Sequence, residues 1–265
     1  MSYWETTPPH ICTMAQVRRA LATCAVLTAA RNSLPQIQVF AAPRMESKLA
    51  EHNQYQAKTF DEKSDFFASE KATPASVEPK LRRIACSCRL ETPGTTLLDV
   101  GTGTGALLPF FQEAGVDLAQ VVGVDLSAGM LGFAKERFPE TTFVQEDVLQ
   151  FQGGRFDRVA RAESRLCPAW GLPVVFNACF GNLFDPVAVL RHVARDLLSD
   201  GGLVVISHPL GRPWLRTLQQ SDPRMVLHDL PGKEQLKTML AEVPELELES
   251  LEDDADFYCL VLRRR

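Results

Sequence analysis

Three carboxylates follow three successive apolar segments of the chain, and the first of them leads into a glycine-rich turn. Asp99 precedes the sequence GTGTG at 101–105, Asp125 ends the next apolar segment, and Asp147 follows the one after that. Glycine has no Cβ, so a ligand can lie directly against such a turn, and a helix that follows it offers unpaired N–H groups. A carboxylate at the second position can accept hydrogen bonds from ribose hydroxyls, and one at the third from an exocyclic amine. These residues predict a site for a ligand that carries both groups.

The glycine pattern by itself leaves several alternatives open. Gly101, Gly103 and Ala106 satisfy the dinucleotide fingerprint G-x-G-x-x-G/A, which a nicotinamide-dependent oxidoreductase would use. Asp99, however, stands where a nicotinamide-binding strand has an apolar residue. Each acid also has an ordinary structural interpretation as a helix cap or a loop residue, and Ser127 is a plausible cap of the next helix. A binding protein with a cofactor site but no catalysis is a third alternative.

The elements that position these residues alternate between strands and helices. Short apolar runs predict strands, and the first, second and fifth are apolar almost throughout, as expected when helices cover both faces of a parallel sheet. The pattern predicts a doubly wound α/β fold. The expected strands span 96–100, 121–125, 142–145, 173–177 and 203–207, and the expected helices span 106–114, 128–138 and 187–198. Before them, 58–70 and 78–88 read as amphipathic helices that form a helical N-terminal cap.

Composition excludes several classes of protein. The 265 residues carry a net charge of −5, whereas a protein that coats nucleic acid needs a basic face. We therefore expect no nucleic-acid partner, and no apolar run approaches the roughly twenty residues of a membrane span. The seven cysteines are an odd number at irregular spacings, which predicts reduced thiols in a reducing compartment and no metal site. Oligomeric state leaves no signature in the sequence.

Four motifs in order resemble class I S-adenosylmethionine-dependent methyltransferases. They are TLLDVGTGTG at 96–105, VVGVDLSAGML at 121–131, FVQEDV at 143–148 and LLSDGGLVVIS at 197–207. The resemblance implies a Rossmann-like methyltransferase fold with a seven-stranded, mostly parallel sheet, whose last two strands fit 245–251 and 257–262. It also implies S-adenosylmethionine as the cofactor and a role for each motif residue. The methionine part would lie on Asp99, Gly101, Thr102, Gly103 and Gly105, the ribose on Asp125, and the adenine on Asp147, Leu126 and Val148.

The chain departs from the family's pattern at the fourth strand. After FDRV at 156–159, the segment ARAESRLCPAWGL, which contains Arg161, Arg165 and Pro168, interrupts the expected strand. Arginines and prolines do not fit a central buried strand. We therefore expect 160–172 to be an atypical insertion before the strand that ends at Asn177.

The N-terminal segment differs in composition from the rest. Residues 1–45 contain four arginines and one acid, Glu5. Arg-rich, acid-poor leaders are typical of organelle transit peptides, so we expect 1–45 to be a disordered transit peptide and 46–265 the methyltransferase domain; an N-terminal helix of the domain is the alternative. FNACFGNLFDP at 176–186 and VISHPLGRPWL at 205–215 resemble an uncharacterised plant and algal branch and, less closely, quinone-biosynthesis methyltransferases. That branch favours the chloroplast over the mitochondrion, with the cytoplasm expected if 1–45 is not a leader.

The acceptor site should lie over the carboxyl ends of the strands. Asn177 ends the fourth strand, and His208, the best candidate for a general base, follows the fifth. His228 is a second candidate, and Arg212 could bind an acceptor anion. The Asn/Asp-Pro-Pro-Tyr signature of enzymes that methylate amino groups is missing after the fourth strand, so we expect a small-molecule oxygen or carbon acceptor. An acceptor pocket could be lined by Phe66, Phe67 and Trp214, of which we expect at least one to be core.

Overall fold

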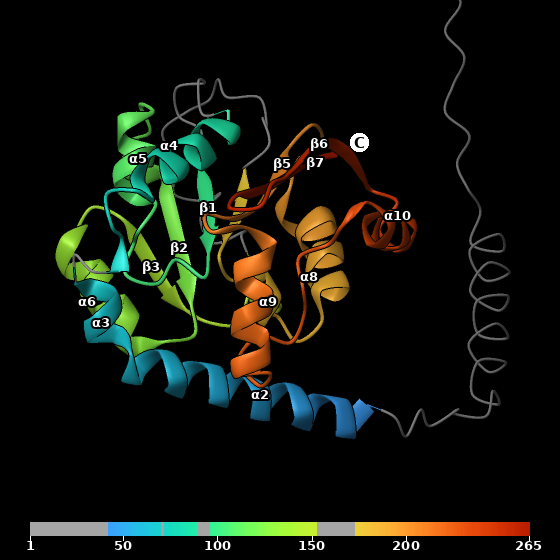
Figure 1. The fold of residues 1–265 in the computed structure, drawn as a ribbon, viewed down its shortest axis with the longest axis horizontal. Coiled ribbons are helices and arrows are strands. Elements are labelled where there is room, and N and C mark those ends of the chain that lie inside the picture. The colour runs from blue at the N-terminus through green and yellow to red at the C-terminus, as the bar shows by residue number, and fades with distance from the viewer. Residues whose placement is uncertain (1–41, 70–71, 90–95, 153–172) are drawn as a thin grey trace, which may run out of the picture. The chain divides into compact units, whose positions relative to one another are not determined.

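The computed structural model describes residues 42–69, 72–89, 96–152 and 173–265 (Figure 1). The expected insertion at 160–172 lies outside these ranges, as does the expected transit peptide except for its last residues. The chain contacts group residues 46–265 into one compact unit. Within the described ranges, no helix combines the length and the apolar character that a bilayer crossing requires.

The described residues form one seven-stranded sheet in the order β3-β2-β1-β4-β5-β7-β6. The first five strands of that order are parallel, and β7 runs antiparallel to both β5 and β6. This is the predicted doubly wound sheet with a terminal hairpin. The strands are β1 (Leu97–Val100), β2 (Val121–Asp125), β3 (Thr142–Gln145), β4 (Val174–Asn177), β5 (Leu203–His208), β6 (Leu246–Asp253) and β7 (Tyr258–Arg264).

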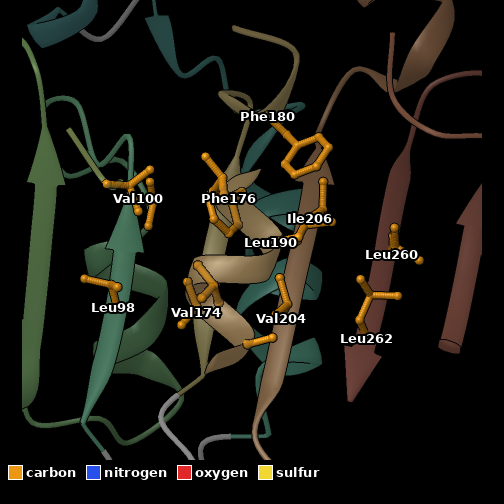
Figure 2. Close-up of a cluster of buried hydrophobic side chains, with 14 of the residues drawn as sticks. Leu98, Val100, Val174, Phe176, Phe180, Leu190, Val204, Ile206, Leu260 and Leu262 are labelled. Carbon is orange, nitrogen blue, oxygen red and sulfur yellow. The ribbon is translucent and has the colours of Figure 1, made fainter. Parts of the chain in front are cut away.

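The central strands are apolar because helices cover both of their faces. All four residues of β1 and all six of β5 are buried. Side chains that point to one face pack with α8 (Pro186–His192), α9 (Gly211–Ser221) and α10 (Lys233–Glu242). Figure 2 shows part of this cluster, with side chains of β1, β4, β5 and β7 around Leu190 of α8. The alternate side chains pack with α4 (Glu78–Ser87) and α5 (Leu108–Glu113), so each face of the sheet has its own core.

Two of the expected helices are divided, and the one expected at 106–114 is shortened to α5 (Leu108–Glu113). The chain expected as one helix at 58–70 divides into α2 (Ala42–Glu62) and α3 (Ser64–Ala68), because Lys63 leaves helical geometry with ψ 3°. The helix expected at 187–198 begins as α8 and continues as a π-helical turn, Val193–Leu197. The helix after β2, α6 (Ala128–Arg137), has the expected cap, since Ser127 Oγ accepts a hydrogen bond from Met130 N–H at 3.1 Å.

Helix α2 lies across the carboxyl ends of the parallel strands (Figure 1). Gln56 donates its amide N–H to the Met225 carbonyl at 2.7 Å, which ties the middle of the helix to the chain after α9. At the end of α2, Asp61 accepts hydrogen bonds from Ser127 Oγ and from Gly129 N–H at 2.9 Å. Helix α2 therefore forms a wall over the strand ends where the predicted site residues gather.

Candidate functional site

The glycine turn after β1 has a backbone shape that L residues rarely adopt. Gly101, Gly103 and Gly105 have φ values of 67°, 56° and 80°. A Cβ on Gly101 would lie 2.6 Å from the Cβ of Cys179, whereas one on Gly103 would meet nothing within 4 Å. A Cβ on Gly105 would lie 2.8 Å from the Phe138 ring. Packing against Cys179 therefore requires glycine at 101, and packing against Phe138 at the end of α6 requires it at 105. The backbone at Gly103 is free to contact a ligand.

Asp99 is a buried carboxylate beneath this turn. Its side chain is 2% exposed, and Thr102 Oγ1 donates a hydrogen bond to its Oδ2 at 2.8 Å. Burial raises the pKa of Asp99 to about 7, with a smaller rise from the nearby charge of Asp125, while the hydrogen bond from Thr102 opposes it. A positively charged ligand group beside Asp99 would restore its charged form.

Asp125 connects the end of β2 to the glycine turn. Its Oδ2 accepts the Gly103 N–H at 2.9 Å, and its Oδ1 accepts the Ser127 N–H at 2.9 Å. Burial raises the pKa of Asp125, and backbone N–H donors from Ser127, Gly103 and Leu126 work against that rise. The carboxylate thus holds the loop in place and presents its oxygens at the strand end where the ribose is expected.

Asp147 follows β3 and is held from two sides. Its Oδ1 accepts the Leu149 N–H at 3.0 Å, and its Oδ2 accepts the side-chain amide of Asn53 on α2 at 2.6 Å. The Asn53 amide stands where the adenine amine is expected to donate, so it satisfies the carboxylate with the same chemistry. Leu126 and Val148, the residues that follow the second and third acids, line the space between them.

These groups surround one cavity of about 280 Å³. It contains eight of the nine residues expected to bind the cofactor, together with Asn177 at the end of β4. The eight are Asp99, Gly101, Thr102, Gly103, Asp125, Leu126, Asp147 and Val148. The structure places Gly105 outside the lining.

The end of β4 bends sharply into the cavity. Ala178 has φ 58°, a left-handed conformation that is uncommon for a residue with a side chain. The bend packs Cys179 against Gly101, and its thiol donates to the Val100 carbonyl at 3.0 Å. The neighbouring Asn177 accepts a hydrogen bond from Ser207 Oγ at 3.1 Å through its Oδ1. No local sequence signal marks the strained alanine.

The structure does not bring His208 into the cavity. It ends β5 as predicted, but it is 3% exposed, and its ring lies 5.2 Å from the ring of Trp214. Its Nδ1 accepts the Leu210 N–H at 3.2 Å, and burial lowers its pKa to about 4. Pro209, the next residue, lines the cavity instead. His208 therefore has the features of a structural histidine that ends its strand.

Helix α2 supplies cavity residues that the sequence did not reveal, namely Leu49, His52, Asn53 and Gln56. His52 Nε2 lies 2.7 Å from the Asn182 carbonyl oxygen, and its ring centroid is 5.7 Å from that of Phe184. Burial lowers the pKa of His52, and His228 adds to that effect, while the Asn182 carbonyl and Asp147 oppose it. The apolar spacing of the helix could have placed it in the fold, but not over these strand ends.

Three further expectations are corrected. Arg212 forms ion pairs with Asp229 at 3.0 Å and with Asp253, so it is not free to bind an acceptor anion. Trp214 and Phe66 are 45% and 55% exposed and lie outside the cavity, whereas Phe67 lines it at 37% exposure. The expectation that at least one of these aromatic residues is core is wrong.

His228 also lies outside the cavity lining. Its Nε2 is 3.3 Å from the Phe184 carbonyl oxygen, and its backbone N–H donates to the Gly181 carbonyl at 2.9 Å. It therefore supports the loop after β4 from behind and is not positioned as a second candidate base.

Comparison with known proteins finds methyltransferases, the family that the sequence motifs resemble. Residues 97–201 match the family model described as "Methyltransferase domain". The chain is 32% identical over 137 residues to a demethylmenaquinone methyltransferase of Renibacterium salmoninarum, a match that covers 50% of each. It is 30% identical over 146 residues to a trans-aconitate 2-methyltransferase of Rhodopseudomonas palustris, covering 54% of this chain and 47% of that one. The chain therefore matches about half the length of these curated relatives.

Among solved structures, the fold is similar to that of the magnesium protoporphyrin IX methyltransferase from Synechocystis PCC 6803, solved with bound SAH. The TM-score is 0.53 at 15% sequence identity, with 82% of this chain and 98% of that chain covered. At this level of identity the similarity concerns the fold alone.

Proposed function

We propose that this protein, whose residues 97–201 match the methyltransferase domain, transfers a methyl group from S-adenosylmethionine to an oxygen or carbon atom of a small molecule. The observation that carries the proposal is the convergence of Asp99, Asp125 and Asp147 on one cavity beside the glycine turn. Three separate strands supply these acids, so their common placement is a property of the folded site and not of one short motif.

The residues present fit this cofactor. Asp99 and the open backbone at Gly103 are suited to the charged methionine part, and Asp125 offers its two half-buried carboxylate oxygens to the ribose hydroxyls. Asp147 can accept from the adenine amine, with Leu126 and Val148 as apolar walls. In a nicotinamide-binding fold, an apolar residue is expected at the position of Asp99. The carboxylate beneath the glycine turn therefore argues against a nicotinamide cofactor.

The chemistry requires alignment and the exclusion of water. The cofactor supplies an activated methyl group on a sulfonium, which an acceptor atom displaces in line. The protein then has to hold the acceptor opposite the departing sulfur, and well-oriented reactants gain several powers of ten in rate from that alone. The loop after β4 and helix α2 enclose the side of the cavity where the acceptor would enter, and they are the elements that keep it in place.

Thermal shift measurements test the proposal. S-Adenosylmethionine and S-adenosylhomocysteine are expected to raise the melting temperature, and NAD is not. Asp125→Asn should weaken the shift, because hydrogen bonds to a charged acceptor are worth roughly 1.5–3 kcal/mol, or about one to two powers of ten in affinity. Asp117→Asn is the matched control, since Asp117 also accepts an i+2 backbone N–H (from Ala119 at 3.0 Å) but lies outside the cavity. Stabilisation by NAD alone, or equal effects of the two variants, would contradict the assignment.

We further propose that the protein belongs to the plant and algal branch and that residues 1–45 direct it to the chloroplast. The motifs at 176–186 and 205–215 and the four arginines of the leader support this. A fluorescent protein fused to residues 1–45 should enter algal chloroplasts, and the same fusion with Arg18→Glu and Arg19→Glu should not. Accumulation of the first fusion in mitochondria or cytosol would refute the chloroplast assignment.

The acidic net charge of −5 supports a small-molecule acceptor over a nucleic acid.

We also propose that 160–172 is an insertion without a role in the site. Strand β4 begins at Val174, which does not line the cavity, and ends at Asn177, which does. Deleting 160–172 should leave cofactor affinity unchanged, and a large loss of affinity would show that the segment belongs to the site.

A further inference from the structure

His52 of α2 is the histidine that reaches the cavity among those the structure describes. The other three hold structural contacts: His192 with Asp196 and Phe151, His208 with Leu210, and His228 with Phe184. His52 is half-buried and stands against the loop after β4, which continues directly from Asn177 at the strand end. It is thus the titratable group placed between helix α2 and the region where the acceptor is expected.

The hydrogen bond of His52 fixes which of its nitrogens carries the proton. A carbonyl oxygen can only accept, so the 2.7 Å contact with the Asn182 carbonyl requires a hydrogen on Nε2. In the neutral ring, Nδ1 then holds the lone pair, and within the described ranges no group donates a hydrogen bond to it. This differs from His208, whose Nδ1 lone pair is occupied by the Leu210 N–H. His52 is therefore oriented as a proton acceptor that no neighbouring group uses.

The cavity that His52 lines has several apolar walls and no cationic side chain. Leu49, Phe60, Leu183 and Phe184 are among its lining residues, with the Phe184 ring centroid 5.7 Å from that of His52, and none of the lining residues within the described ranges is lysine or arginine. A carboxylate or phosphate acceptor would lose its hydration there without a cationic partner, which is unfavourable. A flat, neutral molecule with an acidic hydroxyl would bury its body against these walls and keep one hydrogen bond to donate.

We propose that His52 is the general base for a neutral aromatic alcohol, an inference that rests on the proposed function and deepens it. The hydroxyl proton of the acceptor passes to Nδ1 of His52. The oxygen's electron pair forms the new bond to the methyl carbon, and the electrons of the broken carbon–sulfur bond remain on sulfur. The products are a methyl ether, a neutral thioether and a protonated His52, which releases its proton to solvent. Asp147 and His228 are the charged and titratable groups that act on the ring, from the end of β3 and from the chain after α9.

The state of the His52 ring is a test that requires no turnover. In histidine labelled with ¹⁵N, with the signal assigned by its loss in His52→Gln, Nδ1 should show the shift of an unprotonated nitrogen at neutral pH and Nε2 that of an N–H. Addition of 2-naphthol in the presence of S-adenosylhomocysteine should move the His52 Nδ1 signal and leave that of His208 in place. A ring that carries its proton on Nδ1, or one that does not respond to 2-naphthol, would overturn the inference.

Kinetics with matched variants separate the inference from the proposed function. The wild-type protein should methylate 2-naphthol but not 2-naphthoate, and kcat/KM should rise with pH as His52 loses its proton. His52→Gln should lower kcat by about 10²–10⁴-fold with a flattened pH profile, while the Kd for S-adenosylmethionine is unchanged. His192→Gln is the control: His192 contacts Asp196 and Phe151 outside the cavity lining, so this variant should retain kcat.

The remaining outcomes are decisive in different ways. Methylation of 2-naphthoate, no turnover of 2-naphthol, or full activity of His52→Gln would overturn the role of His52 and the neutral acceptor, provided that S-adenosylmethionine binds. Failure of the wild-type protein to bind S-adenosylmethionine would instead refute the proposed function itself.

Discussion

The buried carboxylate of Asp99 makes cofactor binding depend on pH in a calculable way. Burial raises its pKa to about 7, so the group is largely protonated in the free protein below neutral pH. If the cofactor's ammonium lies beside it, the complex requires the charged form, and binding must release a proton whenever Asp99 starts protonated. Affinity should therefore rise with pH up to about 7 and level off above it.

The magnitude follows from the fraction of charged Asp99. With a pKa of about 7, about one molecule in ten is charged at pH 6 and nearly all are at pH 8, so the Kd should fall about tenfold between these values, equivalent to about 1.4 kcal/mol. Isothermal titration calorimetry with S-adenosylhomocysteine measures this directly, and buffers of different ionisation enthalpy give the number of protons released.

Asp99→Asn isolates the contribution of this residue. Asparagine keeps the shape and an oxygen that can accept the hydrogen bond of Thr102, but it cannot titrate. The ligand's own amino group titrates equally with both proteins, so the difference between them belongs to Asp99. The variant should bind more weakly at pH 8 and lose the tenfold dependence. An identical pH profile for both proteins would refute the placement of Asp99 beside the ligand's charge.

The same pKa has an opposite effect on folding. In the unfolded chain Asp99 has its ordinary pKa of 3.8, so raising the pH from there to about 7 deprotonates the unfolded chain first and destabilises the fold. The full difference corresponds to about 4 kcal/mol above neutral pH. Asp99→Asn should therefore melt at a higher temperature than the wild-type protein at pH 8 and at a similar temperature at pH 4. A lower melting temperature at pH 8 would contradict this reading of the buried charge.

Three other changes have distinct expected outcomes. Gly101→Ala should abolish cofactor binding and lower the melting temperature, because the new Cβ would lie 2.6 Å from the Cβ of Cys179. Gly103→Ala, with open space around it, should lower the melting temperature less. Equal losses of melting temperature in the two variants would count against the packing argument. His208→Gln should reduce stability without changing the calorimetric Kd for the cofactor, since the ring is buried outside the cavity. A higher Kd in this variant would show that His208 belongs to the site. Arg212→Leu should cost roughly 3 kcal/mol in urea unfolding, because it removes the cation that pairs with Asp253 and leaves Asp229 with Arg216 as its remaining ion-pair partner. Arg216→Leu should cost far less, because the Arg216 side chain is 54% exposed and Asp229 keeps Arg212. Similar costs for the two variants would refute the structural role of Arg212.

The sheet could be predicted from the sequence because its signals are local. Strand β2 was expected at its observed bounds, since a continuous apolar run ends at Asp125 and Ser127 caps the next helix. The number of strands and the place of the last two followed from the resemblance to a family and not from the apolar runs themselves. The short strand β1 and the glycine turn are likewise predictable from their own apolar and glycine residues. The positions of the three acids then follow from the strand ends.

The wall of the site could not be predicted in the same way. His52 and Asn53 contact Asn182 and Asp147, which lie 130 and 94 residues away in the chain, and nothing near position 52 indicates such partners. His208 was correctly placed at the end of β5, but the side to which its ring turns depends on Trp214 and on the Leu210 N–H. Position along a strand was therefore predictable, whereas contacts between distant elements had to be seen.

A crystal structure of the protein with S-adenosylhomocysteine would test this site most directly. The ribose hydroxyls should lie within hydrogen-bonding distance of Asp125, the adenine between Leu126 and Val148, and the adenine amine should be directed at Asp147. A ligand bound elsewhere, or one whose ribose does not contact Asp125, would contradict this assignment.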